Sequence, residues 1–424
     1  MNTLRLGSRG PDVELLQVAL TRVGYFADAI DGAFGPVTQR AVINFQSAGG
    51  LGVDGVAGPA TWSSLNPYLT GYVRHTMRTG DTFFSLSRQY RTTMGAITAA
   101  NPHISPADPI PGAQIIVPLG FDVVPVNISF TSNLLAICID GLLARYPFIG
   151  SSTIGASVLG KPIWALSVGR GQNQVMYNAS HHANEWITTP VLMRFLEQYA
   201  AIFSGLDLPA LRPIISEMYE KSTIFFVPMV NPDGVDLVTG ATAPGSAEYE
   251  NAKAMNYLYL PFPSGWKANI RGVDLNVNYP AGWETARDIK YAQGYTRPGP
   301  RDFVGPYPLS EPESAAMAEF TRSHNFTLTL SYHTQGEVIY WRYLDHMPPR
   351  SEEIVKLISR VSGYMYEDTP HSSGHAGYKD WFIQDYNRPG YTIECGLGEN
   401  PLPLSQFERI YRDNVGILAL SALV

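Results

Sequence analysis

The sequence predicts a mixed α/β protein in which two small modules precede a larger α/β domain. Three observations lead to this prediction. A turn motif repeats near the N-terminus, a short unit of strands and helices follows it, and apolar β-branched runs then alternate with amphipathic helical patterns up to the end. Such alternation is typical of a mostly parallel, doubly wound sheet. At 424 residues the chain is long enough for two or three domains.

Composition narrows the classes of function. Hydrophobic residues make up 45% of the chain, which allows a sizeable core and argues against disorder. The net charge is −7 and no dense run of Lys and Arg occurs, so we expect no nucleic-acid partner. Charged residues are only 16% whereas Tyr is frequent at 24 copies, a surface composition that suits uncharged or sugar-like ligands.

Two further absences shape the expectations. The only cysteines are Cys138 and Cys395, too few for a disulfide framework or a cysteine-based zinc site, and both are expected in the core. No stretch of about 18 apolar residues is present, so no membrane span or membrane partner is expected. The first residues show no basic head followed by an apolar run, so no secretory signal is expected either.

Residues 1–68 contain an internal repeat. DGAFGPVT at residues 31–38 recurs as DGVAGPAT at residues 54–61. Each copy predicts a tight turn in which Gly permits positive φ and Pro begins a helix. Helical patterns cover residues 13–23, 37–46 and 60–65. The segment resembles a three-helix peptidoglycan-binding domain, and a purely structural helical cap is the alternative.

Residues 71–119 read as a strand, two helices and a second strand. The strand at residues 73–77 is followed by helices at residues 83–90 and 94–100, and the second helix ends at Asn101-Pro102 because Pro disfavours helix before it. The G-D-T before the first helix, the A-x-N-P and the closing P-G-x-x-I-x-V-P look like a LysM domain. This resemblance implies binding to chains that contain N-acetylglucosamine.

Residues 121–424 carry the α/β pattern. Buried strands are predicted at residues 175–178, 223–230, 327–332 and 391–394, and a helix at residues 188–203. Ser310-Glu311-Pro312-Glu313 has the form of a capping box and predicts the start of another helix. Asn231-Pro232-Asp233-Gly234 is interpreted as a structural turn after the second strand.

Polar side chains follow the ends of three of these strands. His182 and Glu185 come after the first strand, His333 directly follows the third, and Glu394 closes the last. Open α/β sheets bind ligands outside the carboxyl ends of their strands, so these side chains are expected to meet. Two imidazoles, one carboxylate and an open position make a catalytic zinc site, and a further carboxylate can act as base.

On these motifs, residues 121–424 resemble the catalytic domain of zinc metallocarboxypeptidases. H-A-N-E-W matches the first two ligands of one zinc ion, S-Y-H-T the third, and G-V-D-L-N a supporting Asp and a substrate-binding Asn. Asp380-Trp381, 14 positions before Glu394, matches the family's D-W and catalytic Glu. The resemblance implies a role for each of these residues. His182, Glu185 and His333 would be the zinc ligands, and Glu394 the base. Asp274 would accept a hydrogen bond from a zinc histidine, and Asn276 would bind a substrate carboxylate. His181 is expected not to be a ligand, and five other histidines are expected at the surface: His75, His103, His324, His346 and His371.

Several positions depart from the family pattern. Val277 stands where the family has an Arg that binds the substrate's terminal carboxylate, which argues against ordinary exopeptidase action. Lys267 stands in place of the Arg that polarises the substrate carbonyl. The substrate-capping Tyr falls by count on Ser372, with His375 or Tyr378 as substitutes, and Lys379 is expected to favour an acidic group on the leaving side.

Together these features resemble one subgroup, the γ-D-glutamyl-diamino-acid endopeptidases that cut bacterial cell-wall stem peptides. The resemblance implies peptidoglycan as the partner, with meso-diaminopimelate as the diamino acid, and a cytoplasmic or sporulation-associated location. Three alternatives stay open at this point: a metallo-amidase or deacylase of the same fold, a true carboxypeptidase, and a non-catalytic wall-binding protein.

Overall fold

A computed structural model describes residues 1–108, 110–257 and 259–424. The chain forms two compact units. The first comprises residues 1–129, 133–150 and 196–212, and the second comprises residues 130–132, 151–195 and 213–424. The predicted domain boundaries, 1–68, 71–119 and 121–424, stay a prediction.

The first unit begins with three helices, which confirms the helices predicted there. They are α1 (Pro11–Val23), α2 (Pro36–Ala48) and α3 (Pro59–Thr70). Each starts with a Pro directly after a Gly, because Pro at the first helical position needs no hydrogen-bond acceptor for its missing N–H. The third helix is longer than predicted, since it continues through Pro67.

The repeated turns are each held by a buried glutamine. Gln17 donates from Nε2 to Asp31 Oδ1 at 2.8 Å and to Thr38 Oγ1 at 3.1 Å. Gln46 makes the equivalent bonds to Asp54 Oδ1 at 2.8 Å and Thr61 Oγ1 at 3.1 Å. The Asp and Thr of the repeat therefore fix the path of the chain into the next helix.

A βααβ module follows, as predicted. Strands β1 (Tyr72–Thr76) and β2 (Gln114–Pro118) pair antiparallel, and α4 (Phe83–Gln89) and α5 (Met94–Ala100) lie between them in sequence. A small core contains Phe83, Leu86 and Ile97 with residues of both strands.

The prediction of surface histidines is wrong for His75, which lies in this module. It is only 9% exposed, and it bonds Tyr90 Oη and Asp81 Oδ2 at 2.9 Å each. A single imidazole carries two polar nitrogens, so a pair of local partners is enough to bury it.

The second unit contains an eight-stranded sheet in the order β3-β4-β6-β5-β7-β10-β8-β9. Pairs β6–β5, β5–β7, β7–β10 and β8–β9 are parallel, whereas β4–β6 and β10–β8 are antiparallel. The predicted mixed, mostly parallel sheet is confirmed. Its strands are β3 (Gly150–Ala156), β4 (Pro162–Val168), β5 (Asn173–Ala179), β6 (Ser222–Val227), β7 (Phe326–His333), β8 (Val338–Tyr340), β9 (Met365–Glu367) and β10 (Gly390–Glu394).

The strand predicted at residues 223–230 is shorter than expected. β6 ends at Val227, and Pro228 follows it. Proline has no N–H to donate to a sheet ladder, so the strand stops although Met229 and Val230 are buried.

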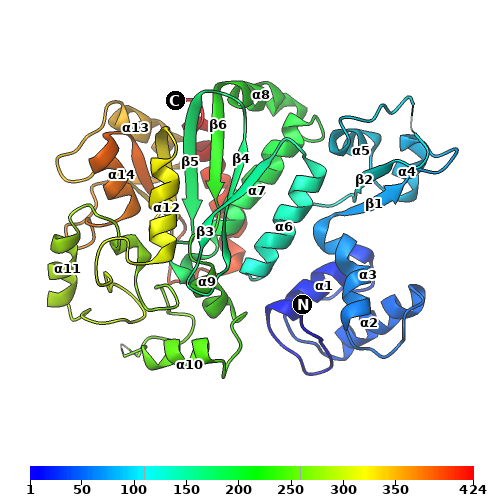
Figure 1. Cartoon of the computed structure of the whole chain (residues 1–424), viewed down its shortest axis with the longest axis horizontal. Helices are drawn as coiled ribbons and strands as arrows, with labels where there is room; N and C mark the ends of the chain where they lie inside the picture. The colour runs from blue at the N-terminus through cyan, green and yellow to red at the C-terminus, as the bar shows by residue number, and fades with distance from the viewer. Residues whose placement is uncertain (109, 258) are drawn as a thin grey trace. The chain divides into compact units, whose positions relative to one another are not determined.

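Helices cover both faces of the sheet, as a doubly wound fold requires. Met176 of β5 packs in one core cluster with Met317 of α12 (Pro312–Arg322) and Trp381 of α14 (Tyr378–Tyr386). Its neighbour Tyr177 points to the opposite face and donates to the carbonyl oxygen of Leu418 in α15 (Phe407–Ser421). Figure 1 shows β4, β6 and β5 side by side, with α12 next to them.

The remaining helices connect these elements along the sequence. They are α6 (Ser132–Arg145), α7 (Thr188–Phe203), α8 (Arg212–Lys221), α9 (Pro232–Thr239), α10 (Ala247–Ala254), α11 (Trp283–Ala292) and α13 (Ser351–Ser362), with 3₁₀ turns at Ala183–Glu185, Pro209–Leu211, Leu275–Val277 and Leu404–Gln406. Helix α7 has the predicted bounds. Among the described residues, no helix is both long and apolar enough to cross a membrane.

The predicted capping box at residues 310–313 is wrong in detail. Helix α12 does begin there, but its N-cap is Glu311, whose side chain makes no cap bond. Ser310 Oγ instead donates to Glu311 Oε1, and the Glu311 Oε2 atom accepts from Asn269. The backbone N–H of Glu311 donates to Asn278 Oδ1 at 3.4 Å, so a side chain distant in sequence contacts the backbone at this helix start.

Candidate active site

The predicted site residues meet at the carboxyl edge of the sheet. Strands β5, β7 and β10 are adjacent and parallel. His333 ends β7 and Glu394 ends β10, and the two residues are direct register partners. His182 and Glu185 lie in the loop and 3₁₀ turn after β5, so all four reach the same edge.

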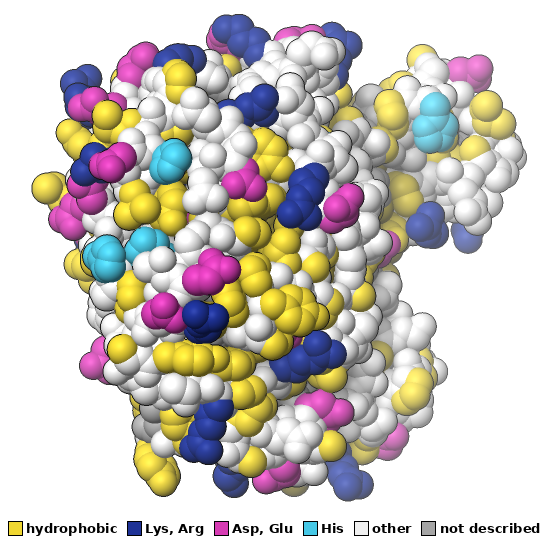
Figure 2. All heavy atoms as spheres, turned by 60° about the vertical axis from the view of Figure 1, so that its left-hand side comes forward, with side chains coloured by type: hydrophobic (Ala, Val, Ile, Leu, Met, Phe, Trp, Pro, Cys, Tyr) yellow, Lys and Arg dark blue, Asp and Glu magenta, His cyan; other side chains and the backbone are white. Residues whose placement is uncertain are grey.

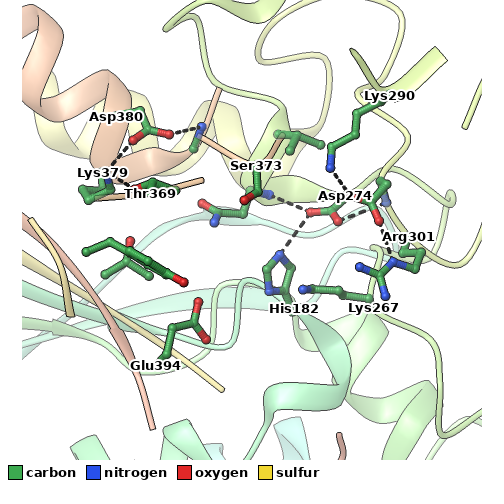
Figure 3. Close-up of a pocket in the computed structure, with 16 residues that line it drawn as sticks. His182, Lys267, Asp274, Lys290, Arg301, Thr369, Ser373, Lys379, Asp380 and Glu394 are labelled. Carbon is green, nitrogen blue, oxygen red and sulfur yellow. Dashed lines mark hydrogen bonds and ion pairs between the residues drawn. The ribbon is translucent and has the colours of Figure 1, made fainter. Parts of the chain in front are cut away.

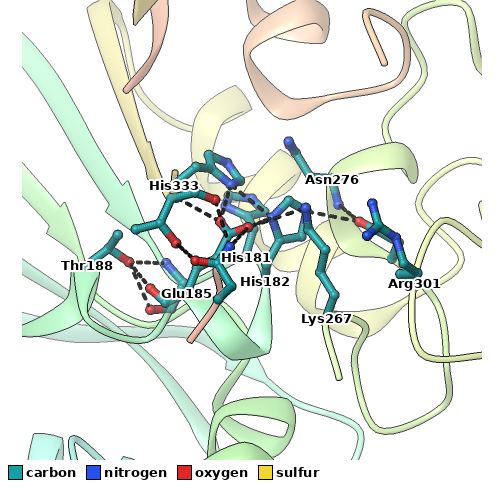
Figure 4. Close-up of polar contacts among 12 residues, drawn as sticks. His181, His182, Glu185, Thr188, Lys267, Asn276, Arg301 and His333 are labelled. Carbon is teal, nitrogen blue, oxygen red and sulfur yellow. Dashed lines mark hydrogen bonds and ion pairs between the residues drawn. The ribbon is translucent and has the colours of Figure 1, made fainter. Parts of the chain in front are cut away.

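His182, Glu185 and His333 form a buried cluster suited to a metal ion. The Nδ1 atoms of the two histidines lie 3.0 Å apart. The Glu185 carboxylate bridges them, with Oε1 3.0 Å from His182 Nδ1 and Oε2 2.9 Å from His333 Nδ1. Figure 4 shows the three side chains converging on one point.

This donor set fits zinc. Two imidazole nitrogens and a carboxylate are ligands that Zn²⁺ prefers, and three protein ligands leave a position for water or substrate. Two neutral Nδ1 lone pairs facing each other at 3.0 Å repel, whereas a cation between them is bound by both. The fold directs His333 Nδ1 into the cluster, since this nitrogen lies 2.9 Å from Glu185 Oε2, whereas Nε2 is buried and has no partner among the described residues.

Asp274 sets the tautomer of His182. Its Oδ1 lies 3.1 Å from His182 Nε2, and a carboxylate can only accept, so the proton resides on Nε2 and Nδ1 keeps its lone pair. Backbone N–H groups of Asn276 and Asp302 also donate to Asp274 at 3.1 Å each. Burial raises the pKa of Asp274, but the neighbouring His182 outweighs it and lowers the pKa overall, so the group stays ionised.

Glu185 is held as a carboxylate in the same way. Burial alone would raise its pKa, yet His182 and Lys267 lower it well below the ordinary value. Its Oε2 also accepts from the backbone N–H of Thr334 at 3.2 Å. The ionised form is the one that coordinates a metal.

Glu394 and Lys267 line the same pocket as His182. Burial, reinforced by the nearby Glu185 carboxylate, raises the pKa of Glu394, which is the shift expected for a group that exchanges protons near neutral pH. Lys267 Nζ lies 3.3 Å from Glu185 Oε1, so its charge is next to the candidate metal position. The pocket has a volume of about 160 Å³.

Two predicted substrate-binding residues also line this pocket. The Asn276 Oδ1 atom accepts from the backbone N–H of Tyr378 at 3.1 Å, which leaves its amide nitrogen to donate to a ligand. Lys379 Nζ pairs with Asp380 Oδ1 at 2.6 Å and donates to Arg342 O and Thr369 Oγ1. The ammonium group of Lys379 therefore makes one ion pair and two hydrogen bonds within the protein.

The predicted capping residues do not line the pocket. Tyr378 is fully buried, and its hydroxyl lies 2.8 Å from Thr321 Oγ1 under α12. The suggested substrate contact is wrong for Tyr378, because its side chain packs into the core rather than toward the site. His375 is 6% exposed, and its Nδ1 atom lies 3.3 Å from Tyr343 Oη, so it too is engaged away from the pocket.

Three other residues that the sequence analysis singled out also lie in this region. His181 stands outside the metal cluster, with Nε2 2.9 Å from Tyr279 Oη. Asn231 caps α9 and donates to the carbonyl oxygens of His181 and Ala268, which supports the structural interpretation of that turn. Val277 is buried against Trp283, so it brings no charge to the pocket.

The pocket also contains residues that sequence reasoning missed. Lys290, Arg301 and Asp302 line one side of it, and Tyr340 and Ser373 also contribute. None of them follows a predicted strand or belongs to one of the motifs above. The signal that could have found Lys290, Arg301 and Asp302 is the frequency of charged residues between positions 284 and 302.

Comparison with known proteins decides the family. Residues 136–416 match the model of the zinc carboxypeptidase family, residues 9–65 a peptidoglycan binding domain, and residues 75–118 a LysM domain. The chain belongs to the zinc carboxypeptidase family. It is therefore a zinc metallopeptidase with wall-binding modules, and the predicted single zinc ion agrees with both the family and the donor set.

Relatives of this family member divide into near and distant ones. The γ-D-glutamyl-L-diamino acid endopeptidase 1 of Lysinibacillus sphaericus is 47% identical over 277 residues, which are 65% of this chain and 68% of that protein. Carboxypeptidase B of Bos taurus is 25% identical and is matched over 58% of this chain and 57% of its own length. Among solved structures, thrombin activatable fibrinolysis inhibitor has a TM-score of 0.54 at 18% identity, covering 83% of this chain and 98% of that one, which shows the shared fold.

Proposed function

We propose that this zinc peptidase cleaves the bond between γ-D-glutamate and the diamino acid, meso-diaminopimelate, in peptidoglycan stem peptides. The observation that carries the proposal is the 47% identity to an endopeptidase named for that bond, in a chain that also matches two wall-binding modules. The replacement of the family's carboxylate-binding Arg by the buried Val277 agrees with an enzyme that does not require a free C-terminus next to the bond.

In the proposed reaction, Glu394 accepts a proton from the attacking water and passes it to the leaving amine. Lys267 donates to the carbonyl oxygen as negative charge develops there. Asp274 keeps His182 in the tautomer whose Nδ1 points inward. Zinc, held by His182, Glu185 and His333, would supply Lewis acidity and lower the pKa of a bound water.

Asn276 and Lys379 are the proposed contacts on the leaving side. The amide nitrogen of Asn276 can donate to a carboxylate of the diamino acid. Lys379 would reach the distal carboxylate by exchanging one of its present acceptors, of which Thr369 Oγ1 at 3.2 Å is the longest. We expect Lys379→Ala to reduce the preference for diaminopimelate over lysine, with the exposed Lys356→Ala as matched control. An unchanged preference would remove Lys379 from the site.

The test of the function is mass spectrometry of L-Ala-γ-D-Glu-meso-diaminopimelate peptides incubated with the zinc-loaded protein. Cleavage between γ-D-Glu and the diamino acid, lost on chelation, would support the proposal. Release of only a terminal residue would indicate a carboxypeptidase despite Val277. Cleavage of simple acylated amino acids instead would indicate an amidase or deacylase, and intact peptide with strong wall binding a non-catalytic protein.

Two coarser proposals accompany this one. Residues 1–68, 71–119 and 121–424 are proposed as the three domains, which limited proteolysis followed by mass spectrometry of the cut sites would test. A cytoplasmic or sporulation-associated place of action is proposed from the resemblance to the endopeptidase subgroup. Fractionation of cells during growth and sporulation, with an antibody to the protein, would locate it.

A further inference from the structure

One wall of the active-site pocket holds a charged cluster without a role in the reaction described above. Lys290 of α11 and Arg301 of the following loop both bind the same carboxylate, Asp302. Lys290 Nζ lies 2.6 Å from Asp302 Oδ1, and Arg301 Nε lies 2.5 Å from Asp302 Oδ2. All three residues line the pocket.

This cluster carries more positive than negative charge. Elsewhere in the pocket each cation has its own carboxylate, since Lys267 pairs with Glu185 and Lys379 with Asp380. On this wall Lys290 and Arg301 share the carboxylate of Asp302, and the ionised Asp274 beside them also interacts with Arg301. Lys290 and Asp302 are each only 7% exposed, so solvent screens the surplus charge less than it would at the surface.

Arg301 has hydrogen-bond donors that are not used within the protein's described residues. Its hydrogen bond to a described residue is made by Nε, and its Nη atoms donate to no other residue in the described part of the chain. A guanidinium group presents its donors in a planar fork that matches a carboxylate. Arg301 can therefore hold Asp302 and still bind an anion in the pocket.

The cluster lies opposite the proposed leaving side. Figure 3 shows Arg301, Lys290 and Lys267 on one side of His182, whereas Lys379, Asp380 and Thr369 lie on the other. A substrate that places its diamino acid toward Lys379 places its acyl part toward Arg301. With the diamino acid placed at Lys379 as proposed above, the Arg301 wall is the acyl side of the cleavage site.

We propose that Arg301, with Lys290 beside it, binds the free α-carboxylate of the γ-linked glutamyl residue. The inference rests on the function proposed above and adds a specificity-determining residue to it. A glutamyl residue linked through its γ-carbon keeps its α-carboxylate, a short carbon chain away from the scissile carbonyl. An α-linked peptide has no carboxylate at that distance unless its acyl residue is itself acidic, so Arg301 selects for acyl groups that carry this carboxylate.

The test compares two substrates that differ only at this carboxylate. One is L-Ala-γ-D-Glu-meso-diaminopimelate, and the other carries an α-carboxamide on the glutamyl residue. We expect the wild type to prefer the carboxylate. Arg301→Gln should lower kcat/KM for the carboxylate substrate by about 10- to 100-fold, the range for a hydrogen bond to a charged group, and change the carboxamide substrate little.

The matched control is Arg287→Gln. Arg287 belongs to the same helix as Lys290 and pairs with Asp288, but it does not line the pocket. The Arg287→Gln variant should retain the wild-type preference for the carboxylate substrate. A binding measurement accompanies the kinetics: in calorimetry, L-Ala-D-Glu should bind more tightly than L-Ala-D-isoglutamine to the wild type, and this difference should vanish in Arg301→Gln.

The outcomes separate the two proposals. If the wild type leaves the γ-D-glutamyl bond intact, the proposed function fails and this inference falls with it. If the wild type cuts that bond without regard to the α-carboxylate, only the inference fails. Equal losses on both substrates in Arg301→Gln would make Arg301 a structural residue and would also overturn the inference.

Discussion

Glu394 shows how the end of a strand becomes a candidate base. β10 ends at this residue beside His333 of β7, so the sheet register brings the carboxylate to the metal cluster. Burial raises its pKa, which favours uptake of a proton from water. The same side chain on an exposed loop would have neither the position nor the shifted pKa.

We expect Glu394→Gln to lower kcat by about 10²- to 10⁴-fold, because the amide has the size of the acid but cannot accept a proton. Steady-state kinetics on a soluble stem peptide measure this, with circular dichroism to verify folding. The exposed Glu399→Gln, five residues further on, is the control and should act as wild type. Near-normal kcat in Glu394→Gln would assign the proton transfer to another group.

At the scale of elements, buried polar side chains decide how turns and helix ends are built. Gln46 is 1% exposed and binds the second repeated turn through both ends of its amide. Glu313 is fully buried in the first turn of α12, where it accepts from the backbone of Val158 and from Asn269. Both side chains accept hydrogen bonds from backbone N–H groups that have no partner in regular secondary structure.

Gln46→Ala should destabilise the three-helix module by about 2–4 kcal/mol, because it removes the amide partner of the buried Thr61 hydroxyl and of the buried Gly55 N–H. Hydrogen exchange of amides in residues 1–68 measures the loss. Asn44→Ala, exposed on the same helix, should leave exchange unchanged. Equal protection in both variants would show that the turn holds without its glutamine.

Glu313 should make stability depend on pH. Burial raises its pKa to about 7 from 4.5. Its contribution is therefore complete below pH 4.5 and is lost as the pH rises to 7, since the unfolded chain releases the proton first. The free energy of unfolding should fall by about 3 kcal/mol over this interval.

Glu313→Gln should abolish that decline, so that the variant gains on the wild type between pH 5 and pH 8. Denaturant unfolding across this range gives the difference directly. Glu319→Gln, exposed on the same helix, should follow the wild-type curve. Parallel curves for Glu313→Gln and wild type would mean that Glu313 titrates normally.

At the scale of the whole molecule, binding and cleavage belong to different parts of the chain. The peptidoglycan-binding and LysM matches fall in the first compact unit, and the metal cluster falls in the second. The face in Figure 2 shows Lys and Arg side chains interspersed with Asp and Glu, without a continuous basic area.

Chelation should therefore abolish hydrolysis of stem peptides while binding to insoluble peptidoglycan persists. Sedimentation of the protein with purified wall, before and after chelator, measures binding, and peptide release measures cleavage. Added Zn²⁺ should restore activity, whereas Mg²⁺ should not, because it prefers oxygen ligands over imidazole. Loss of wall binding on chelation would contradict the assignment of binding and cleavage to different parts of the chain.

Residues 182, 185, 333 and 394 could be brought together from sequence, because apolar strands are visible as runs and parallel strands meet at one edge. The repeated turns and the βααβ unit could be predicted for a similar reason, since Gly, Pro and capping residues act over a few positions. Tertiary structure alone turned Tyr378 into the core and brought Lys290, Arg301 and Asp302 to the pocket. The direction of a side chain at a helix start and the path of a long loop depend on packing against distant residues, which no local pattern encodes.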